Sequence, residues 1–358
     1  MSELCLVINL GSSSLKAALV DDTGACPWQQ NRHLNPSDNL QQMLESWLAP
    51  ALEPFRDRLE LIAHRVVHGG EHFTAPTLIT EAVENALQEL TPLAPLHNPP
   101  ALQGLAWARG WSPSLPQWAC FDTAFHSSLP TCASSYAIPS ELRRRGFRRF
   151  GFHGINHQHV AETVAEQWRQ EGRDPSQLRL ISAHLGAGAS LAAIRGGVCV
   201  DTTMGFTPLD GLVMATRCGS IDPGVLLALM REGTGADQLA KTLQEQSGLQ
   251  GLSDLSGDMR EIRAAAATSH NGAIRALAVF KHRLHQLVGA MAASLRGADV
   301  LALTGGIGEH DKALKRELTQ ELQWLSGLDI IVVPANEEGM IARLCRRHSN
   351  RPGSVAVG

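Results

Sequence analysis

The stretch INLGSSSLKAALV, residues 8–20, places one glycine, three serines and a lysine between two apolar runs. The runs LCLVIN (4–9) and LKAALV (15–20) are each short enough for a buried strand, so the stretch predicts strand, tight turn, strand. The turn can be an ordinary polar loop, because glycine and serine form turns without any ligand. It can also bind phosphate, because hydroxyls, backbone N–H groups and a lysine suit phosphate oxygens. The stretch lacks the second glycine of the P-loop pattern, so it is not a P-loop.

A second stretch, AHLGAGASLAAIR at 183–195, has the same pattern of strand, small-residue turn and strand. Aligned from Leu10 and Leu185, LGSSSLKAAL and LGAGASLAAI share a leucine, a glycine and two alanines, and Leu19 is matched to Ile194. The two stretches lie about half the chain apart. We therefore expect an internal duplication in which each half contributes one phosphate-facing hairpin.

A third glycine turn, VLALTGGIGEHD at 300–311, follows an apolar strand and precedes an amphipathic helix at 312–325. Strand, glycine turn and helix can hold a nucleotide phosphate or ribose against backbone amides. Helices also fit 157–170, 224–232 and 272–296, and the last has a broad apolar face suited to the core or to a subunit interface. The Pro-rich stretches 91–102 and 110–118 predict structured loops.

Composition limits the class of protein. With 358 residues and 44% hydrophobic content, the chain can build two domains with sizeable cores. The net charge of −4 gives no general attraction to nucleic acid or acidic membranes, which favours small-molecule chemistry. The seven cysteines are scattered and never spaced as C-x-x-C, which indicates reduced thiols in a cytoplasm. We expect no signal peptide and no membrane span.

Several short segments place charged or imidazole groups among small residues. Arg65 and Arg217 can each hold a carboxylate or phosphoryl oxygen by two hydrogen bonds, although a single arginine more often forms a surface ion pair. Asp122 follows the apolar run WACF, at what the pattern predicts to be a strand end. The helical spacing of His64, His68 and His72 invites a zinc site, but the HGG sequence would break any helix there.

These segments, taken together and in order, resemble the signatures of the acetate kinase family. They run from residue 9 to residue 338 and read NLGSSSLK, HRVVHGGE, LAPLHNPP, FDTAFH, GFHGINH, HLGAGAS, DTTMGFTPLDGL, TRCGSIDP, GGIGE and PANEE. The resemblance implies duplicated ribonuclease H-like, or actin-like ATPase, α/β domains with a nucleotide cleft between them. It also implies a homodimer that transfers the γ-phosphoryl of ATP to acetate with Mg²⁺, or with Mn²⁺ in its place, giving acetyl phosphate and ADP.

The resemblance assigns roles to matched residues. Arg65, Asp122, His153 and Arg217 would be catalytic, and Asn9, Asp122 and Glu337 would lie at the metal. The acyl pocket would be lined by Arg65, Val67, Leu96, Phe152 and Pro208. The nucleotide and its phosphates would contact Asn9, Ser12, Ser14, Lys16, His184, Gly186, Gly188, Asp258, Arg260, Gly306, Ile307 and Gly308. The first domain would span 1–150 plus 337–358, and the second, with the nucleotide site and the dimer interface, 151–336.

Three positions depart from the family's pattern. Ala187 replaces an asparagine beside the phosphates, Ser220 replaces an aspartate near Arg217, and Gly257 replaces a serine. Two further interpretations therefore stay open beside acetate kinase. One is a kinase for propionate or a longer acid, and the other is a nucleotide-binding protein of this fold that has lost turnover.

Overall fold

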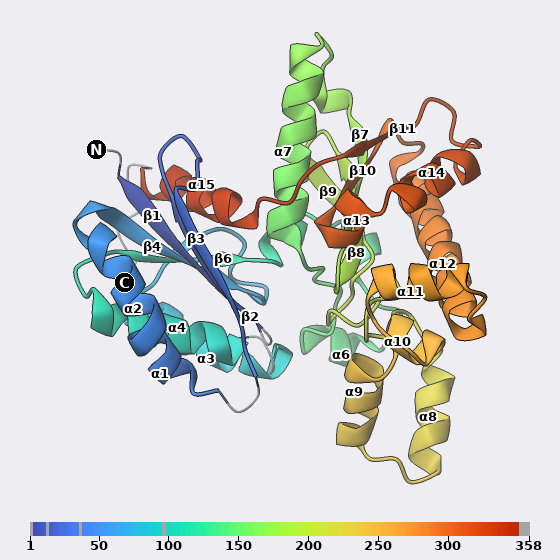
Figure 1. Cartoon of the computed structure of the whole chain (residues 1–358), viewed down its shortest axis with the longest axis horizontal. Helices are drawn as coiled ribbons and strands as arrows, with labels where there is room; N and C mark the ends of the chain where they lie inside the picture. Colours follow the sequence, from blue (N-terminus) through green and yellow to red (C-terminus); the bar gives the residue numbers. More distant parts are fainter. Residues whose placement is uncertain (1–2, 12–13, 36–37, 95–97, 351–358) are drawn as a thin grey trace. The chain divides into compact units, whose positions relative to one another are not determined.

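The computed structural model describes residues 3–11, 14–35, 38–94 and 98–350. The chain divides into two compact units (Figure 1). Unit 1 comprises Met1–Ser127, Gly154–Asn156 and Asn336–Gly358, and unit 2 comprises Ser128–His153 and His157–Ala335. This division groups residues 128–153 with the second unit, whereas the sequence interpretation placed 128–150 in the first. Arg149 illustrates why, since its guanidinium donates to the carbonyls of Thr202, Thr203 and Met204.

Unit 1 is built on a six-stranded sheet of order β3-β2-β1-β4-β6-β5. Strands β1, β2 and β3 form an antiparallel meander, and β4 and β6 add parallel strands beside β1. Its strands are β1 (Leu4–Leu10), β2 (Ser14–Val20), β3 (Trp28–His33), β4 (Leu59–Val66), β5 (Thr77–Leu78) and β6 (Gln117–Phe121). Its helices include α1 (Leu40–Met43), η1 (Leu44–Leu48), α2 (Ala49–Leu52), η2 (Glu53–Arg58), α3 (Glu81–Glu89), η3 (Thr91–Leu93), α4 (Asn98–Trp111), η4 (Ala124–His126) and α15 (Glu337–Ser349).

Unit 2 repeats this topology in a sheet of order β9-β8-β7-β10-β11. Again the first three strands form an antiparallel meander and the last two run parallel to the first. The strands are β7 (Arg179–Leu185), β8 (Ala189–Arg195), β9 (Val198–Thr202), β10 (Val300–Thr304) and β11 (Asp329–Val332). The matching strand orders confirm the internal duplication that the two hairpins predicted, and they agree with the actin-like fold class that the resemblance implied.

The helices of unit 2 flank its sheet and extend beyond it. They are α5 (Thr131–Ser134), α6 (Ser140–Arg144), η5 (Pro175–Gln177), α8 (Pro223–Arg231), α9 (Ala236–Glu245), α10 (Gly248–Ser253), α11 (Met259–Ala267), α12 (Asn271–Leu295), α13 (Gly305–His310) and α14 (Lys312–Glu321). Helix α7 (Gly154–Gln170) begins with residues of unit 1 and continues in unit 2. Helix α12 buries Phe280, Leu284 and Val288 on one face, so the apolar face expected at 272–296 serves the core.

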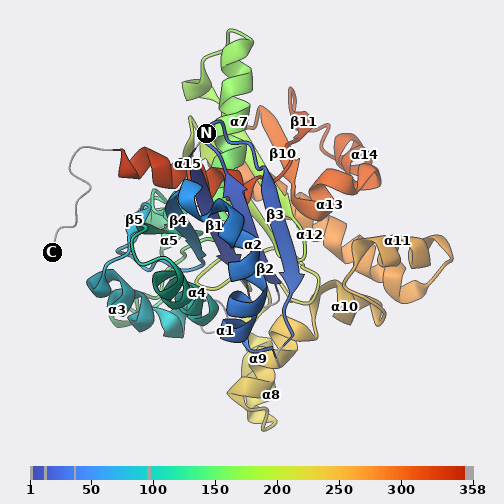
Figure 2. The same cartoon turned by 60° about the vertical axis from the view of Figure 1, so that its left-hand side comes forward.

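The sheet of unit 1 lies between two helical layers (Figure 2). Alternate side chains of β1, such as Leu6 and Ile8, pack with α1, η1 and α4 on one face. The intervening Cys5 and Val7 pack with α15 on the other face, beside Met340. Because β1 is buried on both faces, its sequence is continuously apolar and not alternating.

Both glycine hairpins are confirmed as β-hairpins, with one difference. Leu10 pairs with Leu15, whereas Leu185 pairs with Ala189, so the tip of the first hairpin is one residue longer. The ungapped alignment therefore holds for the first strands but shifts by one residue in the second strands. Ser12 lies in this tip and falls outside the described residues.

Two local expectations need correction. The stretch 91–102 was predicted to be a loop, but α4 begins at Asn98 and contains Pro99 and Pro100. Proline is compatible with the first turn of a helix, where its missing N–H group has no partner to lose. The glycine turn after β10 is itself helical, because Gly305–His310 forms α13.

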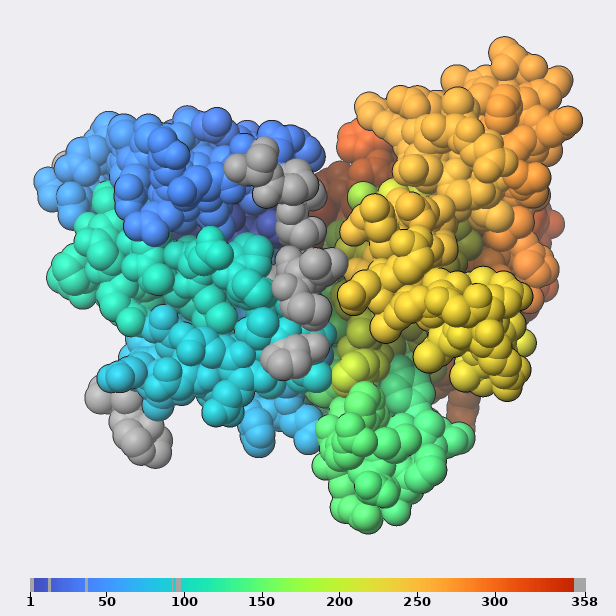
Figure 3. Space-filling model, turned by 90° about the horizontal axis from the view of Figure 1, so that it is seen from below, coloured from blue at the N-terminus to red at the C-terminus, as the bar shows by residue number. Residues whose placement is uncertain are grey.

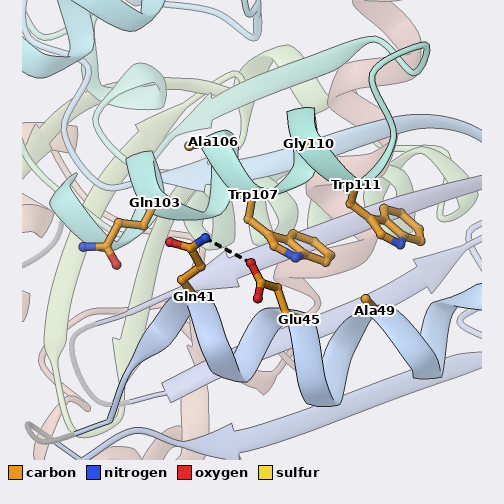
Figure 4. A pocket seen from close by; sticks show the side chains of 8 residues that line it. All are labelled: Gln41, Glu45, Ala49, Gln103, Ala106, Trp107, Gly110 and Trp111. Carbon is orange, nitrogen blue, oxygen red and sulfur yellow. Dashed lines mark hydrogen bonds between the residues drawn. The ribbon is translucent and has the colours of Figure 1, made fainter.

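A cavity of about 560 Å³ lies between the α1–η1–α2 segment and α4 (Figure 4). Trp107 and Trp111 of α4 line the cavity and stack on each other, with ring centroids 5.5 Å apart. Gln41 and Glu45 line it from the other segment, and the Gln41 side chain donates to the Glu45 carboxylate. None of the site residues expected from the sequence lines this cavity. In the described residues no helix is long and apolar enough to cross a membrane.

Candidate active site

The ends of three parallel strands of unit 1 bring polar side chains together. Asn9 lies at the end of β1, Arg65 at the end of β4, and Asp122 directly follows β6. Arg65 Nη1 donates to Asn9 Oδ1 at 3.0 Å, and Arg65 Nε donates to Asp122 Oδ1 at 3.1 Å. Arg65 Nη2 donates to the other carboxylate oxygen, so the arginine and Asp122 form a two-pronged pair. The carboxyl ends of parallel strands are the usual place for such a site.

Burial governs the electrostatics of this pair. Burial raises the pKa of Asp122, whereas the positive charge of Arg65 lowers it. The pKa stays above its ordinary value because Glu337 also raises it. Burial would lower the pKa of Arg65, but Asp122 and Glu337 raise it well above its ordinary value. The arginine therefore stays charged and remains a fixed cation for an anionic substrate.

Helix α15 brings two more carboxylates to this group. Asn336 caps the helix by accepting from Gly339 N at 3.0 Å, which places Glu337 and Glu338 in the first turn. Asn9 Nδ2 donates to Glu337 Oε2 at 3.4 Å, and Glu337 and Glu338 both raise the pKa of Arg65. The buried Oε1 of Glu338 has no hydrogen-bond partner within the described part of the chain. Three carboxylates thus surround one guanidinium.

Three further residues that the resemblance assigned to the site, Lys16, Ser14 and Val67, lie in the described part of unit 1. Lys16 pairs with Asn9 in the β1–β2 register, so its side chain emerges on the same face next to Asn9. Ser14 begins β2, and its carbonyl accepts from Gly11 N at 2.9 Å. Val67 is buried directly after β4. Leu96 lies outside the described residues, so its place in an acyl pocket stays a prediction.

In unit 2, His153 occupies a strained backbone position. It precedes α7 with φ of 57°, a left-handed conformation that a residue other than glycine rarely adopts. Its ring stacks on His184, with centroids 4.2 Å apart and planes inclined by 23°. Its Nδ1 lies 2.9 Å from Ser190 Oγ. The imidazole is therefore held in both position and plane, as a group with a directed role requires.

The second hairpin tip places His153 and Arg217 together. A Cβ built on Gly188 would lie 3.2 Å from His153 Nε2 and 3.6 Å from Arg217 Nη1. Glycine at this position therefore leaves space beside the His153 ring and the Arg217 guanidinium. The neighbouring Phe152 is buried and Pro208 is half-buried, and both belong to unit 2.

A cavity of about 750 Å³ opens in unit 2 between the second hairpin, α11 and α13. Five of the expected nucleotide residues line it, namely Gly186, Asp258, Arg260, Gly306 and Ile307. Gly308 does not line it, because it packs against the backbone of Leu303. The sequence interpretation did not identify Arg263, His310 and Asp311, which also line it and whose polar types alone give no distinguishing signal.

Asp258 and Arg260 form one edge of this cavity. Asp258 caps α11 by accepting from Arg260 N at 2.8 Å, and its carboxylate also accepts from the Arg260 side chain. These hydrogen bonds lower the pKa of Asp258 to about 2. Above that pH the carboxylate is charged, and Arg260 remains exposed at the cavity edge.

The structure explains two departures from the family's pattern. Ser220 Oγ donates to Asp210 Oδ1 at 2.6 Å, so an aspartate there would face a like charge. A Cβ built on Gly257 would lie 2.9 Å from the carbonyl oxygen of Ala215, so glycine fits this bend before α11 without a shift. Ala187 is exposed and lines the cavity with its methyl group, which leaves more room there than an asparagine would.

No zinc site is found where the histidine spacing invited one. His64 lies in β4 and not on a helix, and its Nε2 is 2.9 Å from the side-chain amide of Gln117. Across the described ranges no group of three or more histidine, cysteine or acidic side chains could hold a metal ion by itself.

The sequence interpretation also missed part of the surroundings of His153. His157, Ser182 and Ser190 are fully buried and hydrogen-bonded to one another. The sequence places His157 at the start of the predicted helix 157–170 and His153 four residues before it. This spacing could not be interpreted without knowing that β7 and β8 pack there.

The two units therefore have the actin-like ATPase fold and carry the cationic groups and the cavity of a nucleotide-dependent phosphotransferase. The family model of the acetokinase family matches residues 24–332. An acetate kinase of Synechococcus sp. is 42% identical over 354 residues, covering 89% of this chain and 87% of that protein. The chain belongs to the acetokinase family, which confirms the resemblance found in the motifs.

Solved structures agree with this assignment. The crystal structure of Porphyromonas gingivalis acetate kinase matches with a TM-score of 0.87 and 32% identity, covering 97% of this chain and 99% of that one. A propionate kinase from Francisella tularensis matches with a TM-score of 0.84 and 33% identity, covering 96% and 99%. Relatives named for two different acids are thus similar to this chain in almost equal degree.

Proposed function

We propose that the protein is an acetate kinase that reversibly transfers the γ-phosphoryl group of ATP to acetate, giving acetyl phosphate and ADP. The observation that carries this proposal is the fixed pair of Arg65 with Asp122 at the strand ends of unit 1. A module that only binds nucleotide has no need of a half-buried guanidinium fixed at this place. Membership of the acetokinase family at about 40% identity supports the same reaction.

Residues of both units have a part in the proposed reaction. Arg65 would bind the carboxylate of acetate, because Asp122 and Asn9 hold its guanidinium in one orientation. Arg217 would stabilise the charge on the phosphoryl group in transit, and His153 would donate a hydrogen bond to one of its oxygens. The attacking carboxylate oxygen forms the new bond to phosphorus while the bond to the ADP oxygen breaks. No covalent enzyme intermediate is required.

The nucleotide would occupy the cavity of unit 2. Its phosphates would lie against the backbone N–H groups of the Gly186–Gly188 tip and of α13, with Asp258 and Arg260 on the nucleoside side. Ser12, Ser14, Lys16 and His184 would contribute further phosphate contacts, and Gly308 would support α13 from behind. The serine hairpin of the first unit is on this proposal one half of a phosphate clamp.

The residues of unit 1 fit a divalent cation such as Mg²⁺ or Mn²⁺. Asp122, Glu337 and Glu338 outnumber the positive charge of Arg65, and one buried oxygen of Glu338 has no hydrogen-bond partner in the part that the structure describes. Hard oxygen donors suit Mg²⁺, which usually keeps several waters and binds few protein groups directly. Asn9, Asp122 and Glu337 would hold it, directly or through water. When bound, the ion neutralises negative charge on the phosphates.

A second candidate substrate is propionate, because a propionate kinase is structurally as similar as the acetate kinases. Val67, Leu96, Phe152 and Pro208 would line the acyl pocket. Discrimination between two acids that differ by one methylene amounts to only about 1 to 3 kcal/mol in a hydrophobic pocket. We therefore expect acetate to be preferred and propionate to be used more slowly.

The assembly and location are also proposals. Helix α8 buries none of its residues, and its Val225, Leu227 and Met230 are 43%, 52% and 55% exposed (Figure 3, yellow). Ile274 on α12 is likewise exposed. These apolar side chains support a homodimer formed through unit 2. We also propose a cytoplasmic enzyme, with the domains assigned as 1–150 plus 337–358 and 151–336.

The decisive experiment is steady-state turnover with Mg-ATP and acetate, propionate or butyrate, with the acyl phosphate trapped by hydroxylamine. Arg217→Ala should lower kcat on the order of 10³-fold or more while ATP still binds. Ordinary turnover in this variant would refute the role of Arg217. No acyl phosphate from any acid, with nucleotide binding intact, would instead favour a binding protein in which Ala187 and Ser220 mark lost catalysis.

A further inference from the structure

Three buried side chains of unit 2 connect His153 to the interior through one line of hydrogen bonds. Ser182 Oγ lies 2.8 Å from His157 Nδ1, and His157 Nε2 lies 2.8 Å from Ser190 Oγ. Ser190 Oγ in turn lies 2.9 Å from His153 Nδ1. Ser182, His157 and Ser190 are each 0% exposed, so water does not compete for these groups.

Neighbouring elements of the fold bring the members of this line together. His153 directly precedes α7 and its carbonyl accepts from His157 N at 2.9 Å, so the two histidines lie at the same end of the helix. Ser182 and His184 are two residues apart on β7 and share a face of the sheet, and Ser190 pairs with His184 from β8. The ring of His184 stacks on His153 and meets His157 edge-on, with centroids 6.4 Å apart. Helix and sheet thus hold every member in place.

Ser190 is 0% exposed and its Oγ makes no other hydrogen bond among the described residues, so its own proton must be donated within the line. The number of protons then allows only two directions for a line of neutral groups. A hydroxyl supplies one proton, and a neutral imidazole has one N–H donor and one acceptor nitrogen. In the first direction Ser182 donates to His157 Nδ1, His157 Nε2–H donates to Ser190, and Ser190 donates to His153 Nδ1. His153 then carries its proton on Nε2. In the second direction every bond is reversed, and His153 carries its proton on Nδ1.

The buried end of the line favours the first direction. In the second direction Ser182 accepts from His157, and its own hydroxyl proton then needs another acceptor. The described residues provide no other hydrogen bond for Ser182 Oγ. A buried donor without an acceptor is costly because its interaction with water is not replaced. In the first direction each hydroxyl proton has an acceptor.

We propose that Ser182, His157 and Ser190 are positioning residues that fix His153 as the neutral Nε2–H tautomer and direct that proton toward the Gly188 turn. The direction follows from geometry, since a Cβ built on Gly188 would lie 3.2 Å from His153 Nε2. The inference rests on the proposed function for its consequence, which is that the phosphoryl group meets a neutral hydrogen-bond donor of fixed orientation. The tautomer itself does not depend on that function.

The first test identifies the ring nitrogen that carries the proton. Two-bond ¹⁵N–¹H correlation spectra of the histidine-labelled full chain distinguish the tautomers, and His153→Gln assigns the signal of His153 by its loss. We expect Nε2–H in the unsubstituted protein. Ser182→Ala removes the hydroxyl that distinguishes the two directions, so the Nε2–H population of His153 should fall to about half. Ser182→Thr retains the hydroxyl and should restore the tautomer.

Kinetics provide the second test. Ser182→Ala should lower kcat about twofold and Ser190→Ala about tenfold or more, with KM for acetate and ATP unchanged in both. The matched control is Ser134→Ala, which removes another buried serine of unit 2 whose hydroxyl donates only to the carbonyl of Pro130 at 3.2 Å. This control should change neither the tautomer nor kcat.

The outcomes separate the inference from the proposed function. An Nδ1–H tautomer or a doubly protonated ring at His153 in the unsubstituted protein would overturn the inference, whatever the activity. So would a Ser182→Ala protein that matches Ser134→Ala in both spectra and kcat. The expected tautomer in a protein without kinase activity would support the hydrogen-bonded line and count against the proposed reaction alone.

Discussion

Acidification should destabilise unit 1 through His64, a histidine that no part of the proposed reaction uses. The side chain is 1% exposed in the middle of the sheet. Burial lowers its pKa from 6.5 to about 4. The amide of Gln117 satisfies all its neighbours when its Nε2 donates to His64 Nε2 at 2.9 Å and its Oε1 accepts from Arg109 N at 3.0 Å. Protonation of His64 Nε2 would remove the lone pair that accepts this bond.

The sign and size of the effect follow from the two pKa values. The unfolded chain takes up the proton near pH 6.5, whereas the folded chain resists it until about pH 4. The stabilising contribution of His64 is therefore fully present above pH 6.5 and is lost as the pH falls toward 4. One pKa unit corresponds to about 1.4 kcal/mol, so lowering the pH from about 7.5 to about 5 should reduce the free energy of unfolding by about 2 kcal/mol.

The assay is urea unfolding at a series of pH values, followed by tryptophan fluorescence. Five of the seven tryptophans, at 28, 47, 107, 111 and 118, belong to unit 1. His64→Gln keeps a neutral polar side chain beside Gln117, and its pH dependence should be shallower by the same amount. His33→Gln on the exposed strand β3 is the control and should retain the full dependence. An unchanged pH dependence in His64→Gln would refute the argument.

Further predictions concern the candidate site residues of the two units. Asp122→Asn should lower the free energy of unfolding by about 3 to 5 kcal/mol in urea titrations, because it removes the buried carboxylate that accepts from two nitrogens of the Arg65 guanidinium; a loss under about 1 kcal/mol would contradict this. Gly188→Ala should lower kcat about tenfold or more by crowding His153 and Arg217, while Gly235→Ala, whose Cβ would meet nothing within 4 Å, should keep its activity; equal kcat values would count against the crowding. Asp258→Ala should raise the KM for ATP about 3- to 10-fold with kcat unchanged, and a lower kcat instead would assign Asp258 a different role.

The hairpins and their duplication could be predicted from sequence because they depend on local patterns. Short apolar runs on both sides of a small-residue turn allow few alternatives, and the second copy raised the probability that neither was accidental. The one-residue difference between the tips could not be predicted, since the alignment has no gap. Only the pairing of Leu10 with Leu15, against Leu185 with Ala189, reveals it.

The site residues could be identified as types but not as contacts. A buried strand followed by an aspartate marks Asp122 as a candidate, yet nothing in the sequence says that Arg65 holds both of its oxygens. The same limit applies to Ser220, whose replacement of an aspartate is explained only by its hydrogen bond to Asp210. Such contacts join residues of distant segments, and their specificity arises from packing that no local pattern records.

The duplicated topology provides the two units with corresponding strand ends but different chemistry. Asn9 and His184 end corresponding strands, and the registers of β1 with β4 and of β7 with β10 match Arg65 to Thr304. Where unit 1 has a guanidinium, unit 2 has a buried threonine followed by the glycines of α13. A charged side chain at this edge suits a small carboxylate, whereas a short side chain and glycines expose the backbone to a nucleotide. One fold can thus hold both substrates of a phosphoryl transfer, because the position that carries charge in one copy leaves space in the other.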